Sequence, residues 1–347
     1  MNKPLISVKN LSVDYITEAA PINAVRNVSF EIFRGEIFGL VGESGSGKST
    51  VVQAMMRILA PPALISRGRV FIDGKSIIEA SKQDIIGFRW KQISIVMQSA
   101  LNALNPVLSV REQIFDVLST HKGLIGKEAD DRARELLSLV DIDFTHLESY
   151  PHQLSGGMKQ RIVIAIALAI MPPIIIMDEP TTALDVIVER EIIAKIIELR
   201  KKLEFTILFI THDLNLLLEF ADKLAIMRNG EIIELNEVKE IQKGGNHAYT
   251  QKLIGSIPSA SGKRKEGLLS KPDSLNFSNI PILEVRNIKK VFQSPGIFNK
   301  NKIVAVNDVS FKVFKGEIVA LVGESGSGKS TVAKLVTRLI RPSQGSI

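Results

Sequence analysis

The sequence has no cysteine and few aromatic residues, with one tryptophan and three tyrosines among 347 residues. The missing cysteines exclude disulfides, thiolate metal sites and a cysteine nucleophile, and they suit a reducing compartment. The N-terminus lacks the apolar core of a signal peptide. The most apolar region, 161–178, is interrupted by Pro172 and Pro173, so neither part reaches the roughly 18–20 residues that span a bilayer. We therefore expect a soluble chain that meets membranes only through partners.

Positive charge is unevenly distributed, although the formal net charge is +7. Residues 1–258 carry 29 Lys and Arg against 31 Asp and Glu, whereas residues 259–347 carry 15 against 6. A domain that binds nucleic acid needs a basic field on its surface. The first 258 residues offer none, so we expect no nucleic-acid partner.

An internal repeat organises the chain. The residues LVGESGSGKST occur at 40–50 and again at 321–331, and the surrounding segments 24–50 and 305–331 match without a gap. A segment rich in Ser, Lys and Pro separates the two copies and is typical of a linker. The expected organisation is a complete domain, a linker and the N-terminal part of a second copy, at 1–258, 259–281 and 282–347.

Strands alternate with helices along the first copy, which predicts an α/β fold around a mostly parallel sheet. The short apolar run at 174–177 is typical of a strand buried on both faces, and Asn229-Gly230 predicts a hairpin turn. The expected strands are 5–15, 24–33, 36–41, 93–96, 174–177 and 206–210. The expected helices are 48–59, 188–202 and 214–221, with mostly helical chain over 109–170.

Residues 42–49 fit the phosphate-loop pattern G-x-x-x-x-G-K-[ST] between a buried strand and a helix. The glycines let backbone N–H groups point inward, and the following helix directs its positive end at the phosphates. Lys48 supplies charge to the β- and γ-phosphates, and Ser49 can ligate Mg²⁺. The expected ATP-binding residues of this loop are Gly42, Ser44, Gly45, Ser46, Gly47, Lys48, Ser49 and Thr50.

Two adjacent acidic residues follow the apolar run at 174–177. A carboxylate at this end of a buried strand lies beside the phosphate loop, so Asp178 is expected to hold Mg²⁺, directly or through water. Glu179 comes next and is placed to polarise an attacking water as a general base.

A third element is LSGGMKQR at 154–161. Ser155 is suited to cap a helix, and Gly156 and Gly157 expose backbone N–H groups at its start. Together with the phosphate loop and the acidic strand, this element resembles the LSGGQ signature of ABC-type ATPases. Met158 replaces the glutamine, as is common in the peptide-importer branch.

The resemblance covers essentially the whole chain. It implies a P-loop NTPase fold of the ABC type, with a mostly parallel core sheet, an antiparallel β subdomain and an α-helical signature subdomain, plus a partial second copy. In this family each ATP lies between the phosphate loop of one domain and the signature of another, so Ser155–Met158 would act on the ATP of a partner domain.

The resemblance also implies roles for single residues. Tyr15 matches the aromatic residue that stacks on adenine, and Gln98 matches the glutamine that senses Mg²⁺ and couples to the membrane subunits. Asp185 matches the loop that crosses the dimer interface, and His212 matches the histidine that contacts the γ-phosphate.

The second copy lacks a signature, an acidic strand and a switch histidine. We expect residues 282–347 to be weakly ordered or to dock on another surface, and not to hydrolyse ATP, because their sheet edge and helix faces lack neighbours. The simplest interpretation is a tandem ATPase with a truncated second half. The matching residues of this copy are Phe292, Gly323, Gly326, Gly328, Lys329, Ser330 and Thr331.

Two segments resemble importers of oligopeptides and dipeptides, a class whose features nickel and glutathione importers share. They are 98–106, which ends in ALNP, and Asn246–Thr250, where Ala248 replaces the usual proline. The resemblance implies an ATPase at the cytoplasmic face of the membrane that uses ATP and Mg²⁺. Its implied partners are a second ABC domain, two permease subunits and a substrate-binding protein. Two alternatives remain: a non-transport ABC ATPase acting on nucleic acid or the ribosome, and a truncated product that binds nucleotide without driving transport.

Overall fold

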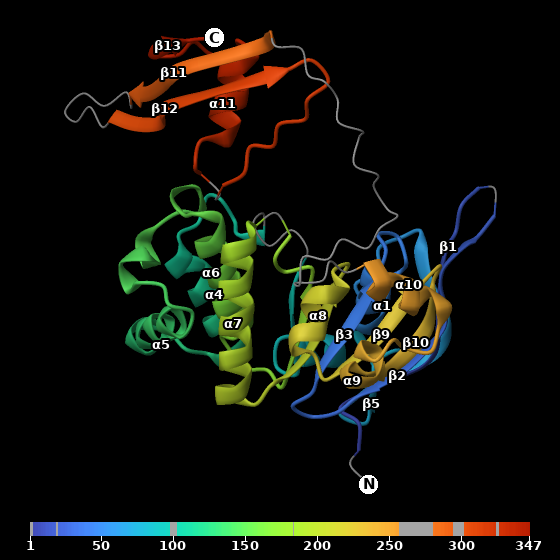
Figure 1. The fold of residues 1–347 in the computed structure, drawn as a ribbon. Coiled ribbons are helices and arrows are strands. Elements are labelled where there is room, and N and C mark those ends of the chain that lie inside the picture. Colours follow the sequence, from blue (N-terminus) through green and yellow to red (C-terminus); the bar gives the residue numbers. More distant parts are fainter. Residues whose placement is uncertain are drawn as a thin grey trace. The chain divides into compact units, whose positions relative to one another are not determined.

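The computed structural model describes residues 3–18, 20–97, 103–182, 184–256, 280–293, 302–323 and 326–347. The chain divides into two compact units, Met1–Ile257 and Pro258–Ile347 (Figure 1). Of the predicted linker at 259–281, residues 259–279 lie outside the described residues.

The first unit contains ten strands and nine α-helices among its described residues, with two short 3-10 helices. The strands are β1 (Ile6–Tyr15), β2 (Ile22–Ile32), β3 (Ile37–Gly42), β4 (Ala63–Ile72), β5 (Lys75–Ser76), β6 (Ile93–Val96), β7 (Ile174–Asp178), β8 (Thr206–Thr211), β9 (Lys223–Arg228) and β10 (Glu231–Glu237). The helices are α1 (Lys48–Met55), α2 (Lys82–Phe88), α4 (Val110–Lys122), α5 (Gly126–Leu139), η1 (Phe144–Glu148), η2 (Pro151–Gln153), α6 (Gly156–Ala167), α7 (Val186–Leu203), α8 (Leu214–Phe220), α9 (Val238–Gln242) and α10 (Ala248–Ser256).

A six-stranded sheet in the order β10-β9-β3-β8-β7-β6 forms the centre of this unit. The pairs from β9 to β6 are parallel, and β10 joins β9 as an antiparallel hairpin. The hairpin turns at Asn229 and Gly230, whose φ angles of 50° and 84° lie in the left-handed region that a tight hairpin needs. The predicted turn and the mostly parallel sheet are therefore confirmed.

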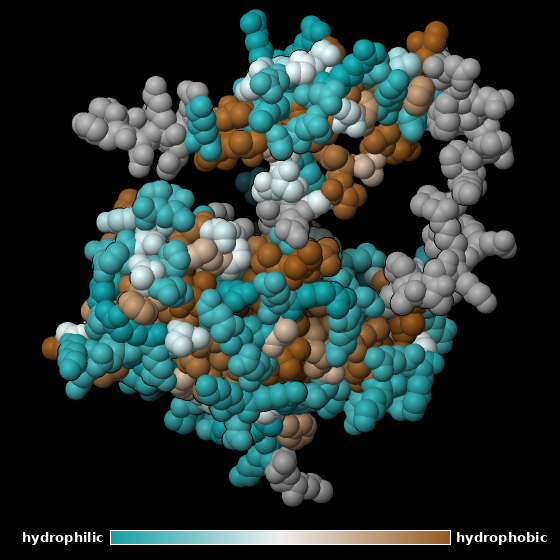
Figure 2. All heavy atoms as spheres, turned by 60° about the vertical axis from the view of Figure 1, so that its left-hand side comes forward, coloured by the Kyte–Doolittle hydropathy of each residue, from teal (hydrophilic) through white to brown (hydrophobic). Residues whose placement is uncertain are grey.

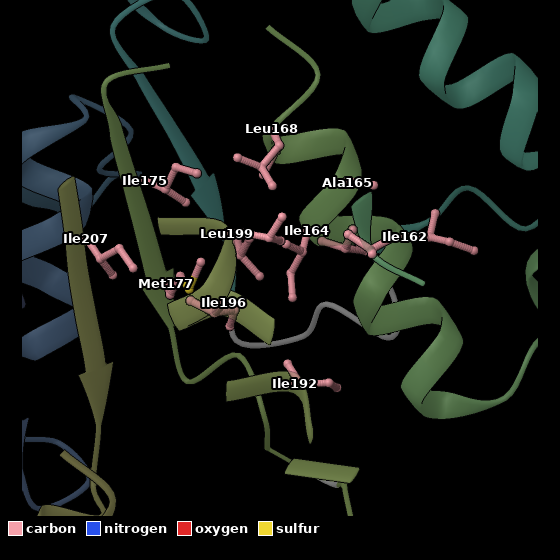
Figure 3. Packing of buried hydrophobic residues seen from close by; sticks show 14 of the residues in the cluster. Ile162, Ile164, Ala165, Leu168, Ile175, Met177, Ile192, Ile196, Leu199 and Ile207 are labelled. Atoms are coloured by element: carbon pink, nitrogen blue, oxygen red, sulfur yellow. The ribbon is translucent and has the colours of Figure 1, made fainter. Parts of the chain in front are cut away.

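Both faces of the central sheet are buried, because successive side chains of a strand point to opposite sides. In β7, Ile175 and Met177 join a core that α6 and α7 cover, as Figure 3 shows. Ile174 and Ile176 join a second core with α1 and the antiparallel sheet β2-β1-β4-β5. The two cores hold the carboxyl ends of the parallel strands in place, and the site lies at these ends.

The sequence-based prediction made one helix too long and missed several elements. The helix expected at 48–59 ends at Met55, because Arg57 takes a φ of 51° and Pro61 and Pro62 follow. The region expected to be mostly helical contains α4, α5 and α6 with two 3-10 segments between them. The missed elements are β4, β5, α2, α9 and α10, whereas β9 and β10 are the two strands of the hairpin that was predicted without strand bounds.

The second unit repeats the beginning of the first. It consists of a sheet in the order β12-β11-β13 and one described helix, around a small core that includes Val285, Ile288 and Leu335. Its elements are β11 (Pro281–Gln293), β12 (Lys302–Phe314), α11 (Lys329–Val336) and β13 (Gln344–Ser346).

One segment of the repeat folds differently in the two units. Residues 318–322 match β3 in sequence, yet they form no strand, and Ile318 and Val322 are 95% and 89% exposed. In the first unit β3 is hydrogen-bonded between β8 and β9. The described residues of the second unit supply no counterpart of these two strands, so the apolar segment stays at the surface, and Figure 2 shows apolar side chains on this unit.

Candidate functional site

The phosphate loop of the first unit connects β3 to α1. Gly45 and Gly47 have φ angles of 79° and 101°, which L side chains rarely adopt. A Cβ atom on Gly47 would lie 2.5 Å from the backbone oxygen of Ala24 in β2, so the glycine also permits a close approach of two backbones. The loop is thereby fixed against the antiparallel sheet.

Lys48 is buried in this loop, with an exposed fraction of 5%. Its Nζ donates to the backbone oxygens of Gly42 and Glu43, both at 2.8 Å, and to Oγ of Ser46 at 3.4 Å. Burial lowers the pKa of Lys48, and the nearby carboxylates of Glu179 and Asp178 counteract part of this change. The loop therefore holds a desolvated cation at the start of a helix, where an anion is stabilised.

Asp178 lies at the carboxyl end of β7 and is 5% exposed. The hydroxyl of Ser49 donates to its Oδ1 at 3.2 Å. Burial raises the pKa of Asp178, and the hydrogen bond from Ser49 opposes this increase. The hydroxyl and the carboxylate are hard oxygen donors of the kind that Mg²⁺ prefers. The described residues contain no group of three or more His, Asp or Glu side chains suited to a metal ion, so a cation here would need phosphate oxygens or water as further ligands.

Glu179 and His212 face each other across the ends of β7 and β8. Nδ1 of His212 lies 3.3 Å from Oε1 of Glu179, and the hydroxyl of Thr182 donates to Oε2 at 3.1 Å. The backbone of Glu179 takes a φ of 47° and its N–H donates to the oxygen of Ile210 at 2.9 Å. This left-handed conformation costs a non-glycine residue about 1–3 kcal/mol. The neighbouring strand therefore holds Glu179 in a conformation that turns its carboxylate toward His212.

The signature residues begin helix α6. Oγ of Ser155 accepts the N–H of Met158 at 3.3 Å, which confirms the expected helix cap. A Cβ atom on Gly157 would lie 2.7 Å from a side-chain carbon of Val188 in α7, so Gly157 allows α6 and α7 to pack closely. Figure 1 shows α6 among the helices of one lobe and α1 in the lobe of the sheets. Helix α6, which the signature residues begin, thus lies in a different lobe from α1, the helix that follows the phosphate loop.

The remaining predicted residues occupy varied positions. Tyr15 ends β1 and is partly exposed, and Asp185 caps α7 by accepting the N–H of Val188 at 3.0 Å. Ser44 is exposed in the loop, and Thr50 lies in the first turn of α1. Gln98 lies outside the described residues.

The loop of the second unit reproduces part of this geometry. Gly326 and Gly328 have φ angles of 82° and 96°, and Nζ of Lys329 donates to the oxygen of Gly323 at 2.7 Å. Unlike Lys48, Lys329 is only partly buried. Phe292, near the end of β11, is 43% exposed, and Ser330 and Thr331 lie in α11.

Sequence reasoning missed two groups at the site of the first unit. One is Thr182, whose hydroxyl donates to Glu179. It lies three residues after Glu179 in the chain, and this short separation could have indicated the contact. The other is Tyr249 of α10, whose hydroxyl donates to Oε1 of Glu43 at 2.5 Å. No local sequence pattern indicates a contact between residues so far apart in the chain.

The profile of the ABC transporter family matches residues 25–182 and 306–347, which is more than half of the chain. The chain belongs to the ABC transporter family. Its similarity to solved structures supports the same fold. A dimeric bacterial ABC transporter cassette, MJ0796, is 30% identical, with a TM-score of 0.61 over 67% of this chain and 98% of that one. The protein cbiO1 of Clostridium perfringens, part of the ABC transporter complex cbiONQ, is 29% identical, with a TM-score of 0.61 over 73% and 93%.

Longer relatives match along the whole chain. Glutathione import ATP-binding protein GsiA of Salmonella paratyphi A is 37% identical over 100% of this chain and 60% of its own length. The ABC transporter ATP-binding protein YejF of Escherichia coli strain K12 is 38% identical over 100% of this chain and 65% of its own length. The chain thus spans less than two thirds of either relative. No helix among its described residues combines the length and the apolar character needed to cross a membrane.

Proposed function

We propose that the first unit binds ATP with Mg²⁺ and hydrolyses it to energise an ABC importer. The observation that carries this proposal is the convergence of Lys48, at the start of α1, with Asp178 and Glu179, at the end of β7, on one edge of the central sheet. A buried ammonium, a Ser–Asp oxygen pair and a carboxylate oriented by a histidine are the groups that phosphoryl transfer to water requires.

Under this proposal, different side chains bind the phosphates, hold Mg²⁺ and activate the attacking water. Lys48 and the loop amides bind the β- and γ-phosphates of ATP and offset the charge that builds up there. Ser49 and Asp178 would hold Mg²⁺, with Gln98 as a further proposed ligand, and the bound cation would neutralise phosphate charge. A water oxygen bonds to the γ-phosphorus as the bond from that phosphorus to the β–γ bridging oxygen breaks. Glu179 accepts the proton from the water, and its contact with His212 keeps the carboxylate directed at the γ-phosphate.

A complete site requires two domains under this proposal. Tyr15 would stack on adenine, while Ser155–Met158 and the loop at Asp185 would face the ATP of a second ABC domain. The position of α6 away from α1 agrees with a signature that serves a partner. We propose a domain at 1–258, a linker at 259–281 and a partial second domain at 282–347, whose loop does not hydrolyse ATP by itself.

The proposed cargo is an oligopeptide, a dipeptide or a related small molecule such as glutathione. The GsiA relatives are named for glutathione import, and the segment Asn246–Thr250 resembles the peptide-importer extension. The proposed partners are two permease subunits and a substrate-binding protein, and the proposed location is the cytoplasmic face of the membrane. Uptake of labelled glutathione and dipeptide by cells lacking the chain should be restored by the parent and not by Lys48→Ala.

Nucleotide binding is tested by thermal unfolding of the full chain with and without Mg²⁺ and ATP. A ligand present at 100 times its Kd stabilises the folded state by about 2.7 kcal/mol, so we expect a clear rise in Tm. Lys48→Ala should remove most of this rise, because the buried ammonium that faces the phosphates is gone. An unchanged Tm in the parent, or an equal rise in Lys48→Ala, would contradict the proposal.

A further inference from the structure

Helix α10 brings a tyrosine to the phosphate loop. The hydroxyl of Tyr249 donates to Oε1 of Glu43 at 2.5 Å, and Glu43 is the second residue of the loop. Both residues border a cavity of about 420 Å³ that Glu179 and His212 also line. α10 packs against α8, which begins two residues after His212. One helix therefore contacts both sides of the proposed site.

The ring of Tyr249 also contacts a residue of the central sheet. The guanidinium of Arg228 lies 4.4 Å from the ring centroid, which is within the range of a cation–π interaction. Arg228 ends β9, and the residue before it, Met227, pairs with Gly42 at the start of the loop. The strand that supports the phosphate loop thus also fixes the ring of Tyr249.

The beginning of α10 is anchored to the same hairpin. Glu234 of β10 is 8% exposed, and its carboxylate accepts the N–H of Asn246 at 2.7 Å and of His247 at 3.0 Å. A buried carboxylate at the amides of a helix start forms charge-assisted hydrogen bonds and complements the helix dipole. α10 is therefore attached to the core, and Tyr249 approaches the loop from a fixed base.

Glu43 connects Tyr249 to the buried Lys48. The Tyr249 hydroxyl holds the side chain of Glu43, whose backbone oxygen accepts Nζ of Lys48 at 2.8 Å. A movement of Glu43 would therefore displace an acceptor of the ammonium that faces the phosphates. Loop conformation and lysine position are coupled, because buried groups of this kind must keep their hydrogen-bond partners.

We propose that Tyr249 is a positioning residue for the phosphate loop, and that the attachment of α10 to Glu43 sets the affinity of the first unit for ATP. This proposal rests on the proposed nucleotide-binding function. It assigns to the C-terminal helix a role in the nucleotide site, beyond its resemblance to the extension of peptide importers.

The hydroxyl is suited to act as a permanent donor. Burial and the hydrogen bond to Glu43 raise the pKa of Tyr249 to about 12, while the charge of Arg228 opposes this. The groups that face this residue are Glu43 from the loop, Arg228 from β9 and His247, which directly precedes α10 and whose Nδ1 accepts the Tyr249 N–H at 3.1 Å. The hydroxyl thus remains protonated throughout the neutral range.

The test is the Kd for ATP, in the presence of Mg²⁺, of full-length variants that all carry Lys329→Ala, so that binding reports the first unit. Tyr249→Phe keeps the ring over Arg228 and removes the hydroxyl. We expect its Kd to rise about three- to tenfold, less than the full value of a hydrogen bond to a charged group because Glu43 transmits the effect. The matched control, Tyr150→Phe, removes the hydroxyl of an exposed tyrosine and should leave the Kd unchanged.

Two further measurements separate positioning from a general loss of structure. Tyr249→Phe combined with Glu43→Ala should bind ATP no more weakly than Glu43→Ala alone, because both changes remove one interaction. Alkaline absorbance titration should show one of the three tyrosines ionising near pH 12, and this transition should vanish in Tyr249→Phe and persist in Tyr150→Phe.

The results separate a failure of the positioning role from a failure of the proposed function. A Tyr249→Phe chain that binds ATP as tightly as its parent overturns the positioning role, and so do additive effects in the double variant. A parent that does not bind ATP at all overturns the proposed function and this inference together. The two failures are therefore distinguishable.

Discussion

Two glycines of the phosphate loop provide a matched pair of substitutions. Gly45 and Gly47 both have a positive φ, at 79° and 101°. A Cβ atom on Gly45 would meet nothing within 4 Å, whereas one on Gly47 would lie 2.5 Å from the Ala24 oxygen and 2.8 Å from the side chain of Met227. Alanine at either position therefore adds backbone strain, and alanine at Gly47 adds a steric clash as well.

The contacts of the two glycines predict how much the free energy of unfolding differs between the two variants. A left-handed backbone costs an L residue about 1–2 kcal/mol, so Gly45→Ala should lower the free energy of unfolding by about that amount. Overpacking costs about 1–3 kcal/mol more. The neighbour of Gly47 is a backbone oxygen of β2 and cannot rotate away, so Gly47→Ala should lose about 2–5 kcal/mol when this term is added to the strain.

Urea unfolding without nucleotide provides the assay. Trp90, the one tryptophan of the chain, lies in the first unit and stacks on His121, so its fluorescence reports this unit. We expect a lower midpoint for Gly47→Ala than for Gly45→Ala at an equal m-value. Equal midpoints for the two variants, or a larger loss in Gly45→Ala, would refute the close contact between the loop and β2.

Two other substitutions test the elements that carry the site, by the same unfolding assay. Asp185→Ala should lower the free energy of unfolding by about 0.5–2 kcal/mol, because the cap of α7 is lost. Asp185→Asn should keep most of the stability, and equal losses in both would argue against capping. Ile175→Ala should lose about 2–5 kcal/mol, because Ile175 is fully buried beneath α6 and α7. Ile187→Ala, at a residue 53% exposed, should stay within about 0.5 kcal/mol, and a comparable loss in both isoleucines would contradict the packing.

The sequence predicted where the main candidate site residues lie because the patterns that mark them are local. The glycine spacing at 42–49 identifies a loop between a strand and a helix, and the run at 174–177 identifies a buried strand that ends in carboxylates. Parallel strands align their carboxyl ends at one edge of a sheet. Asp178 and Glu179 were therefore expected beside the loop, and the structure brings Asp178 to Ser49 and Glu179 to His212.

Contacts between distant parts of the chain determine several features that local sequence patterns did not predict. Residues 318–322 closely match the sequence of β3, yet they remain exposed, because a central strand exists only between partners. The strand β4 was missed, because it forms by pairing with β1 and its side chains are largely exposed or half-buried. The contact between Glu43 and Tyr249 depends on the fold of the whole unit. Short patterns identify the proposed reacting groups, whereas contacts between residues far apart in the chain, such as Glu43 and Tyr249, are known only from the fold.

The most direct measurement of the central claim compares ATP binding and phosphate release in the parent chain and Glu179→Gln, together with the membrane partners. Glutamine retains an oxygen that can accept the Thr182 hydroxyl but cannot take up a proton from water. A general base contributes about 10²- to 10⁴-fold to a rate, so we expect release to fall by that factor while the Kd for ATP changes little. Release by Glu179→Gln at a rate close to that of the parent would contradict the assignment of Glu179 as the general base of an ATPase.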